Sequence, residues 1–175
     1  SSTPNPTAVI MKNMKQLDMF PRITVGVCHA AITNALVTAA GADVVEGIYG
    51  VYPTVSWGDN VPAMAKMTEY MQKLHPADAN NMDYITTWAE GLIQAEIIRL
   101  AIQNVGVSKL TPANIEKYGI QKLSNFDPGG LHGKVSYTPG DNRLSKELRI
   151  FKITGGKINP ITSWILAPKI DYNFQ

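Results

Sequence analysis

The chain has 175 residues, of which 45% are hydrophobic and 17% are charged, and its formal net charge is +2. These values are typical of one globular domain with a sizeable hydrophobic core, and they exclude a disordered chain. Its 16 lysines and arginines are scattered, which argues against a nucleic-acid partner, and its single cysteine excludes an internal disulfide.

The first third of the sequence alternates predicted helices and strands. Apolar residues at helical spacing predict a helix over 8–17, and the β-branched run Ile23–Val27 predicts a buried strand after Pro21. A second helix is predicted over 33–42, and a second strand over Ile48–Tyr52 ends at a proline. This order is typical of βαβ units, so we expect an α/β fold with a mainly parallel sheet flanked by helices.

The middle of the chain is predicted to be helical. Pro62 suits the first turn of a helix over 63–74, and the longest helical pattern runs from about Asp83, the expected N-cap, to Val105. A shorter helix is predicted from Pro112 to about Leu123, with Thr111 as its cap.

The last fifty residues change in character after Asn125. A short strand is predicted over Lys134–Tyr137, and two strands over 149–154 and 158–165 form a C-terminal β-hairpin. Gly155-Gly156 joins these two strands, and paired glycines favour the primed turns of hairpins. Residues 167–175 are predicted to be an irregular tail.

The end of the first strand is the strongest candidate site. Ligands of open α/β sheets bind outside the carboxyl ends of strands, where Val27, Cys28 and His29 lie. A Cys28–His29 catalytic pair is disfavoured, because adjacent strand residues point to opposite faces, so these residues are expected to line a pocket. Trp57 and Tyr84 flank loops, where an aromatic residue forms a ligand wall or packs in the core; both alternatives remain open.

No motif in the sequence predicts a metal site, a cofactor or catalysis. The three histidines, His29, His75 and His132, match no common metal-ligand spacing. The glycine-rich run 129–133 lacks the strand–loop–helix context and the Lys-Ser/Thr pair of a P-loop. We therefore expect a protein that is not an enzyme and that needs no cofactor.

Three stretches of the sequence carry a family resemblance that covers about Thr3 to Trp164. They are residues 4–8 with the following helix and strand, the segment Ala42–Gly50, and the run Asn125–Arg143 with its continuation through 150–153 and 156–157. Together they resemble the carboxyl-terminal part of type I periplasmic solute-binding proteins, the branched-chain amino-acid type that serves ABC importers.

The resemblance implies a bilobal "Venus flytrap" protein that binds a small organic solute, an amino acid or an aromatic or other organic acid, in the cleft between its lobes. Such a protein delivers its solute to an ABC permease in the membrane, and it is periplasmic or extracellular in a bacterium. The alternative is a ligand-sensing domain of a receptor or regulator with the same fold. A hydrolase that uses Cys28 is a third alternative.

By this resemblance, residues 1–82 are the α/β portion of the second lobe, and 83–124 are a helical segment that packs on the first lobe in relatives. Residues 125–175 are the C-terminal strands, hairpin and tail. The chain begins with Ser-Ser-Thr-Pro and is shorter than complete relatives, so we expect a fragment of a longer protein. Its long helix would then lack a partner, and we expect a homodimer or a domain-swapped association.

The resemblance also bears on the ligand. Cys28 falls where amino-acid-binding relatives supply a carboxylate to the ammonium of the ligand, and a thiol cannot replace that charge. An amino acid would leave its ammonium poorly paired, so we expect a solute without one, such as an aromatic or other organic acid or a small amide. By position in the family, Thr3 and Asn5 lie on a loop at the edge of the cleft, and Tyr84 lies where an aromatic side chain covers the solute.

Overall fold

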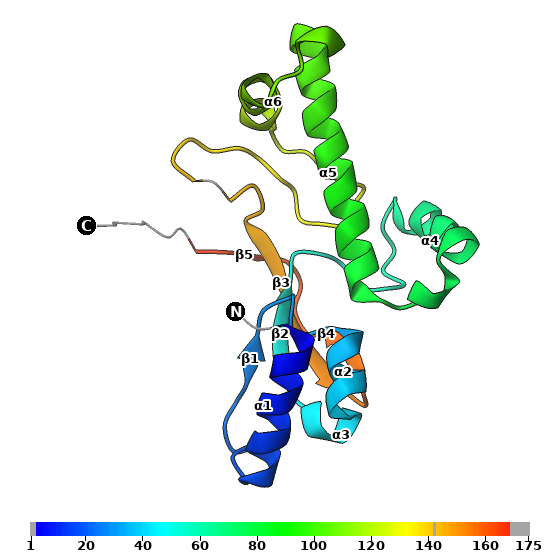
Figure 1. Cartoon of the computed structure of the whole chain (residues 1–175), viewed down its shortest axis with the longest axis vertical. Coiled ribbons are helices and arrows are strands. Elements are labelled where there is room, and N and C mark those ends of the chain that lie inside the picture. Colours follow the sequence, from blue (N-terminus) through cyan, green and yellow to red (C-terminus); the bar gives the residue numbers. More distant parts are fainter. Residues whose placement is uncertain (1–2, 142, 169–175) are drawn as a thin grey trace.

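The computed structural model describes residues 3–141 and 143–168, which form two parts connected by two passages of chain (Figure 1). The lower part, which we call the sheet lobe, comprises residues 3–52 and 147–168. The upper part, which we call the helical part, comprises residues 64–122. Residues 169–175 of the predicted tail lie outside the described residues.

The sheet lobe holds five strands. Their order is β1-β2-β3-β4, and β5 pairs with β3. The strands are β1 (Gly26–Val27), β2 (Tyr49–Tyr52), β3 (Glu147–Thr154), β4 (Lys157–Pro160) and β5 (Ile165–Leu166).

The pairing of these strands confirms the α/β class, but more of the strand pairs are antiparallel than predicted. β1 and β2 are parallel because two helices carry the chain back between them, while β2–β3, β3–β4 and β3–β5 are antiparallel. The antiparallel share of the sheet is therefore larger than the βαβ pattern predicted, because the C-terminal hairpin returns to pair with β2.

Three helices of the sheet lobe pack in the main core with this sheet: α1 (Pro4–Gln16), α2 (Asn34–Ala40) and α3 (Ala42–Val45). The same core extends into the helical part, where it includes Met64, Met67, Met82, Ile85 and Ala89. In that core Tyr52 and Phe151 meet edge to face, with ring centroids 5.3 Å apart. The segment before α2 lies very close to β2, since a Cβ at Gly50 would be 2.4 Å from Cγ2 of Ile32. Glycine at this position of the strand therefore lets the segment before α2 approach the sheet.

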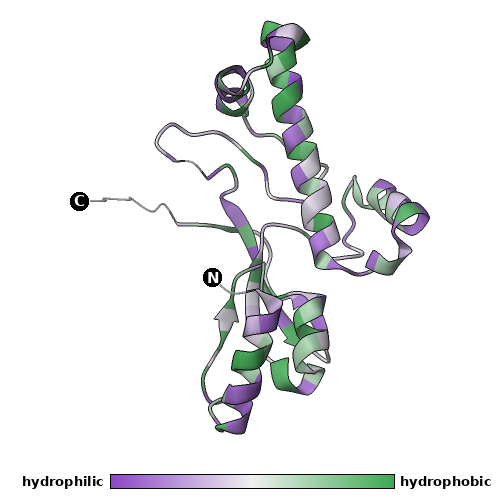
Figure 2. Cartoon of the chain, in the orientation of Figure 1, coloured by the Kyte–Doolittle hydropathy of each residue, from purple (hydrophilic) through white to green (hydrophobic). Residues whose placement is uncertain are grey.

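The helical part contains α4 (Met64–Leu74), α5 (Met82–Val105) and α6 (Pro112–Tyr118). Short 3-10 turns follow α4, α5 and α6 at Pro76–Asp78, Val107–Lys109 and Ile120–Lys122. Hydrophobic residues occur along the whole length of α5 (Figure 2). A small second core, which includes Ile93, Ile97, Leu123 and Val135, joins α5 to the segments after α6. None of the described helices is long and apolar enough to cross a membrane.

Two passages of chain connect the parts and pair with each other; we call residues 53–63 and 123–135 the paired connections. Thr54 and His132 form an antiparallel bridge. Beside it, the Val55 amide donates to the Leu131 carbonyl at 3.0 Å, and the Gly133 amide donates to the Pro53 carbonyl at 3.1 Å. These bonds tie the outgoing and returning chain together where they cross between the two parts.

Several predicted element boundaries hold. The Thr111 hydroxyl accepts a hydrogen bond from the Asn114 amide at 3.2 Å, as predicted. The second helix was predicted to begin at Thr33, and the structure shows that Thr33 is its cap, because its hydroxyl accepts the Leu36 amide at 3.4 Å. Gly155 and Gly156 have φ of 59° and 72°, as a primed hairpin turn requires. The second helix, the second strand, the long helix and the hairpin are thus confirmed, with shifts of a few residues.

Three local predictions are wrong. The predicted buried strand Ile23–Val27 is reduced to the two residues of β1 at the edge of the sheet, and Ile23 is 46% exposed. Asn81, not Asp83, caps the long helix, because its side chain accepts the Asp83 amide at 3.1 Å. The predicted strand at 134–137 forms only isolated bridges at Val135, since neither neighbouring segment extends the pairing.

Candidate functional site

The candidate site is the junction between the sheet lobe and the start of α5. The carboxyl end of β1 and the amino ends of α1 and α2 lie at the end of the sheet lobe that faces the helical part (Figure 1). Two hydrogen bonds hold the entry to α5, one from the sheet lobe and one from the first connection. Nδ2 of Asn34 donates to the Asn80 carbonyl at 3.2 Å, and Nε1 of Trp57 donates to the Asn81 carbonyl at 2.8 Å.

Val27, Cys28 and His29 stand at the carboxyl end of β1, as predicted. Val27 and Cys28 are half-buried and His29 is exposed. The His29 ring meets the ring of Tyr52 edge to face, with centroids 6.3 Å apart. The end of β1 is therefore both open to solvent and in contact with the core of the sheet lobe.

Tyr52 forms the floor beneath these residues. It is fully buried, and its hydroxyl donates to the Ile32 carbonyl. Burial, and then the nearby charges of Asp83 and Cys28, hold the pKa of Tyr52 above its usual value. Tyr52 thus remains a neutral hydrogen-bond donor at physiological pH.

Asp83, in the first turn of α5, is the carboxylate on the helical side of the junction. Partial loss of hydration raises its pKa, and the neighbouring His29 opposes that rise. Sequence reasoning assigned Asp83 only a capping role, because nothing along the chain shows that α5 begins opposite the end of β1.

An aromatic cluster surrounds Tyr84. Its ring lies 6.2 Å, centroid to centroid, from each of Trp57, His75 and Trp88, and the Trp88 ring is stacked on it. Trp57, Tyr84 and Trp88 are half-buried and pack against the main core. Trp57 and Tyr84 are therefore neighbours at the junction, and each combines partial core packing with a solvent-accessible ring surface.

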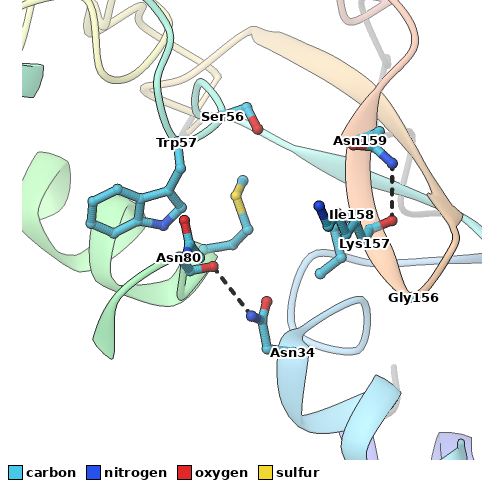
Figure 3. Close-up of a pocket in the computed structure, with 9 residues that line it drawn as sticks. Asn34, Ser56, Trp57, Asn80, Gly156, Lys157, Ile158 and Asn159 are labelled. Atoms are coloured by element: carbon cyan, nitrogen blue, oxygen red, sulfur yellow. Dashed lines mark hydrogen bonds between the residues drawn. The ribbon is translucent and has the colours of Figure 1, made fainter. Parts of the chain in front are cut away.

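A cavity of about 300 Å³ opens beside Trp57, between the amino end of α2, the entry to α5 and the β3–β4 hairpin (Figure 3). We call it the junction pocket. Its lining combines amide, hydroxyl, ammonium and apolar groups and comes from residues far apart in the sequence. They are Asn34, Ser56, Trp57, Asn80, Met82, Gly156, Lys157, Ile158 and Asn159.

The predicted site residues fall into three groups. Val27, Cys28 and His29 lie at the end of β1, while Trp57 and Tyr84 lie together on the helical side, and Trp57 also lines the junction pocket. Thr3 and Asn5 form the third group at the start of α1. Thr3 is the N-cap residue and Asn5 lies inside the helix, so the expectation of a loop at Asn5 is wrong.

Sequence reasoning missed most of the junction pocket. Asn34 had a detectable signal, because it follows a capping threonine at a predicted strand-to-helix turn. Lys157 and Asn159 had none, since only the return of the hairpin to the sheet brings them to the junction. Among the described residues, no group of three or more His, Cys, Asp and Glu side chains is placed to hold a metal ion.

Comparisons with known proteins give matches in structure only. No protein-family model and no curated protein matches the sequence. Among solved structures, a branched-chain amino-acid ABC transporter from Thermus thermophilus with bound valine is 20% identical, with a TM-score of 0.76 over 95% of this chain and 44% of that one.

Two further structures extend this likeness. An ABC transporter substrate-binding protein from Aeropyrum pernix is 15% identical, with a TM-score of 0.73 over 95% of this chain and 43% of that one. A fatty acid ABC transporter substrate-binding protein from Thermomonospora curvata is 16% identical, with a TM-score of 0.71 over 94% of this chain and 42% of that one.

The chain thus spans less than half the length of these proteins. Over that span it has the fold of ABC transporter substrate-binding proteins, the lobe architecture that the sequence resemblance predicted.

Proposed function

We propose that the chain is the carboxyl-terminal part of an extracytoplasmic solute-binding protein of an ABC importer, which holds a small organic solute at the junction. The observation that carries this proposal is the fold likeness combined with the position of the junction. Strand ends, helix amino ends and aromatic side chains converge there, in the arrangement that open α/β folds use for ligands.

Binding without chemistry agrees with the groups at the junction. Cys28 and His29 are adjacent in the chain, and His29 packs its ring on Tyr52. Cys28, His29 and Asp83 lie near Tyr52 and can offer hydrogen bonds and charge to a solute. A binding protein needs such groups and no reaction. A solute that contacts both the sheet lobe and α5 would stabilise one arrangement of the two parts, and a membrane permease could recognise that arrangement.

A thermal-shift screen tests the proposal. The purified chain is heated with plain α-amino acids, aromatic and aliphatic acids, and small amides. A solute at 100 times its Kd stabilises the folded state by about 2.7 kcal/mol. For a chain of this length, that corresponds to a Tm increase of roughly 5–11 °C. Absence of any shift with every class would refute binding at the junction.

Replacing Cys28 with serine separates binding from catalysis. The half-buried thiol is close in size to a hydroxyl, so we expect C28S to keep the Tm shift of whichever solute the screen identifies. The hydrolase alternative predicts complete loss of ester or amide hydrolysis in C28S, and detection of such hydrolysis in the wild type would contradict our proposal.

The expected self-association stays a prediction. The outer face of α5 presents Gly91, Ala95, Ile98 and Ile102 at helical spacing along a shallow groove. Burial of this face against a second copy would remove apolar surface from water. Sedimentation at increasing concentration tests the prediction, and a monomer at the highest concentration would contradict it.

A further inference from the structure

The junction pocket differs in chemistry from the end of β1. Its lining contains one charged side chain, Lys157, and no carboxylate. Ser56 contributes a hydroxyl, and Trp57, Met82 and Ile158 contribute apolar surface on the same cavity. Its volume of about 300 Å³ is at the lower end of the range for small-molecule sites.

Three side-chain N–H groups around the pocket donate to carbonyl oxygens of the protein. Nδ2 of Asn34 donates to the Asn80 carbonyl at 3.2 Å, and Nδ2 of Asn159 donates to the Lys157 carbonyl at 3.2 Å (Figure 3). Nε1 of Trp57 donates to the Asn81 carbonyl. A ligand would therefore find the Lys157 ammonium, the Ser56 hydroxyl and the Asn80 side-chain amide as donors, and Lys157 is the charged one among them.

Three carboxylates close in sequence to the lining residues are engaged, and a fourth, Asp83, directly follows the lining residue Met82 but does not itself line the pocket. One oxygen of Asp59 accepts from Nη1 of Arg149 at 2.6 Å and from the Ser56 amide at 3.0 Å. Asp78 accepts from Asn81, and Glu46 accepts from the Gly155 amide at 2.8 Å. Within the described part of the chain, Lys157 has no ion-pair partner. Its ammonium is thus available to an anionic ligand.

We propose that the junction pocket binds a small monocarboxylate with an apolar body, whose carboxylate pairs with Lys157 and Ser56 and whose body packs on Trp57. Charge-assisted hydrogen bonds to a carboxylate are stronger than neutral ones, and the aromatic face supplies the apolar contact. Residues of the sheet lobe, the first connection and the entry to α5 line the pocket. Its occupant therefore contacts both the sheet lobe and the helical part. This inference rests on the proposed function, because it assigns a ligand class to the junction.

Three probes of similar shape test the charge requirement: benzoate, benzamide and benzylamine. Each is titrated calorimetrically into the chain at pH 7.5 and constant ionic strength. We expect benzoate to bind at least about tenfold more tightly than benzamide, and benzylamine not to bind, because only benzoate matches the Lys157 charge. K157Q should weaken benzoate binding by about tenfold or more, and K157R should retain most of it.

K66Q is the matched control, because Lys66 is an exposed α4 residue that does not line the pocket and its loss changes the net charge equally. It should bind benzoate like the wild type. Equal affinities for benzoate and benzamide, or unchanged benzoate binding by K157Q, would overturn the inference. If benzoate fails while a solute of another class binds in the screen, only this inference falls. If no solute binds, the proposed function falls with it.

Discussion

Replacing Gly129 with alanine tests how tightly the paired connections are held together. Gly129 has φ of +70°, and a Cβ there would lie 2.4 Å from Cβ of Ala63. The Ala63 amide also donates to the Gly129 carbonyl at 3.0 Å, so neither chain can move away without loss of that bond. The substitution therefore combines a strained backbone with steric overlap at the crossing.

The two costs can be given magnitudes. A left-handed conformation costs a non-glycine residue about 1–2 kcal/mol, and overpacking costs about 1–3 kcal/mol. We expect G129A to lower the free energy of unfolding by about 2–5 kcal/mol. G58A provides the control for strain alone, because Gly58 has φ of +84° and a Cβ there would have no neighbour within 4 Å. It should cost only about 1–2 kcal/mol.

Urea unfolding of the wild type, G58A, G129A, A63G and the double variant A63G/G129A measures both contributions. Removal of the Ala63 methyl group should recover the part of the G129A loss that comes from overlap, as a favourable coupling energy of about 1–3 kcal/mol. If G129A and G58A are equally destabilised, or if the coupling energy is below about 0.5 kcal/mol, the close approach of the connections does not contribute as argued.

The remaining predictions concern pH and helix capping. Burial lowers the pKa of His132, so the unfolded chain binds this proton more readily, and stability should fall as pH drops below about 6.5, by at most about 1.4 kcal/mol per pH unit. Urea unfolding between pH 8 and 5 should show a steeper loss for the wild type than for H132Q, and parallel curves would contradict this cause. Separately, T33A removes the α2 cap and should cost about 1 kcal/mol in urea unfolding. T38A, on the exposed side of the same helix, should cost clearly less, and equal losses would contradict the capping role.

The parts of the fold that were predictable depend on local chemistry. Thr111 caps its helix as predicted, because a hydroxyl can accept an amide proton within one turn, whatever surrounds it. Gly155 and Gly156 specify a hairpin turn through backbone freedom alone. The order of elements and the resemblance of three stretches then led to the lobe architecture that the solved structures share.

The parts that were not predictable depend on distant neighbours. The run Ile23–Val27 has the composition of a buried strand, but its burial depends on which chain lies beside it, and in the described structure β1 is an edge strand. Lys157 and Asp83 reach the junction because the hairpin returns and α5 starts there. Residue spacing along the sequence predicts neither the return of the hairpin nor the position where α5 starts.

The pairing of β2 with β3 has a consequence for how the protein is made. Val51 pairs with Ile150, so β2 leaves the ribosome about a hundred residues before the strand that completes it, a long-range contact of the kind that slows folding. At 5–20 residues per second, this delay is roughly 5–20 seconds of synthesis. During that interval the nascent chain carries a strand with an unsatisfied edge, and chaperones that shield such edges would act there.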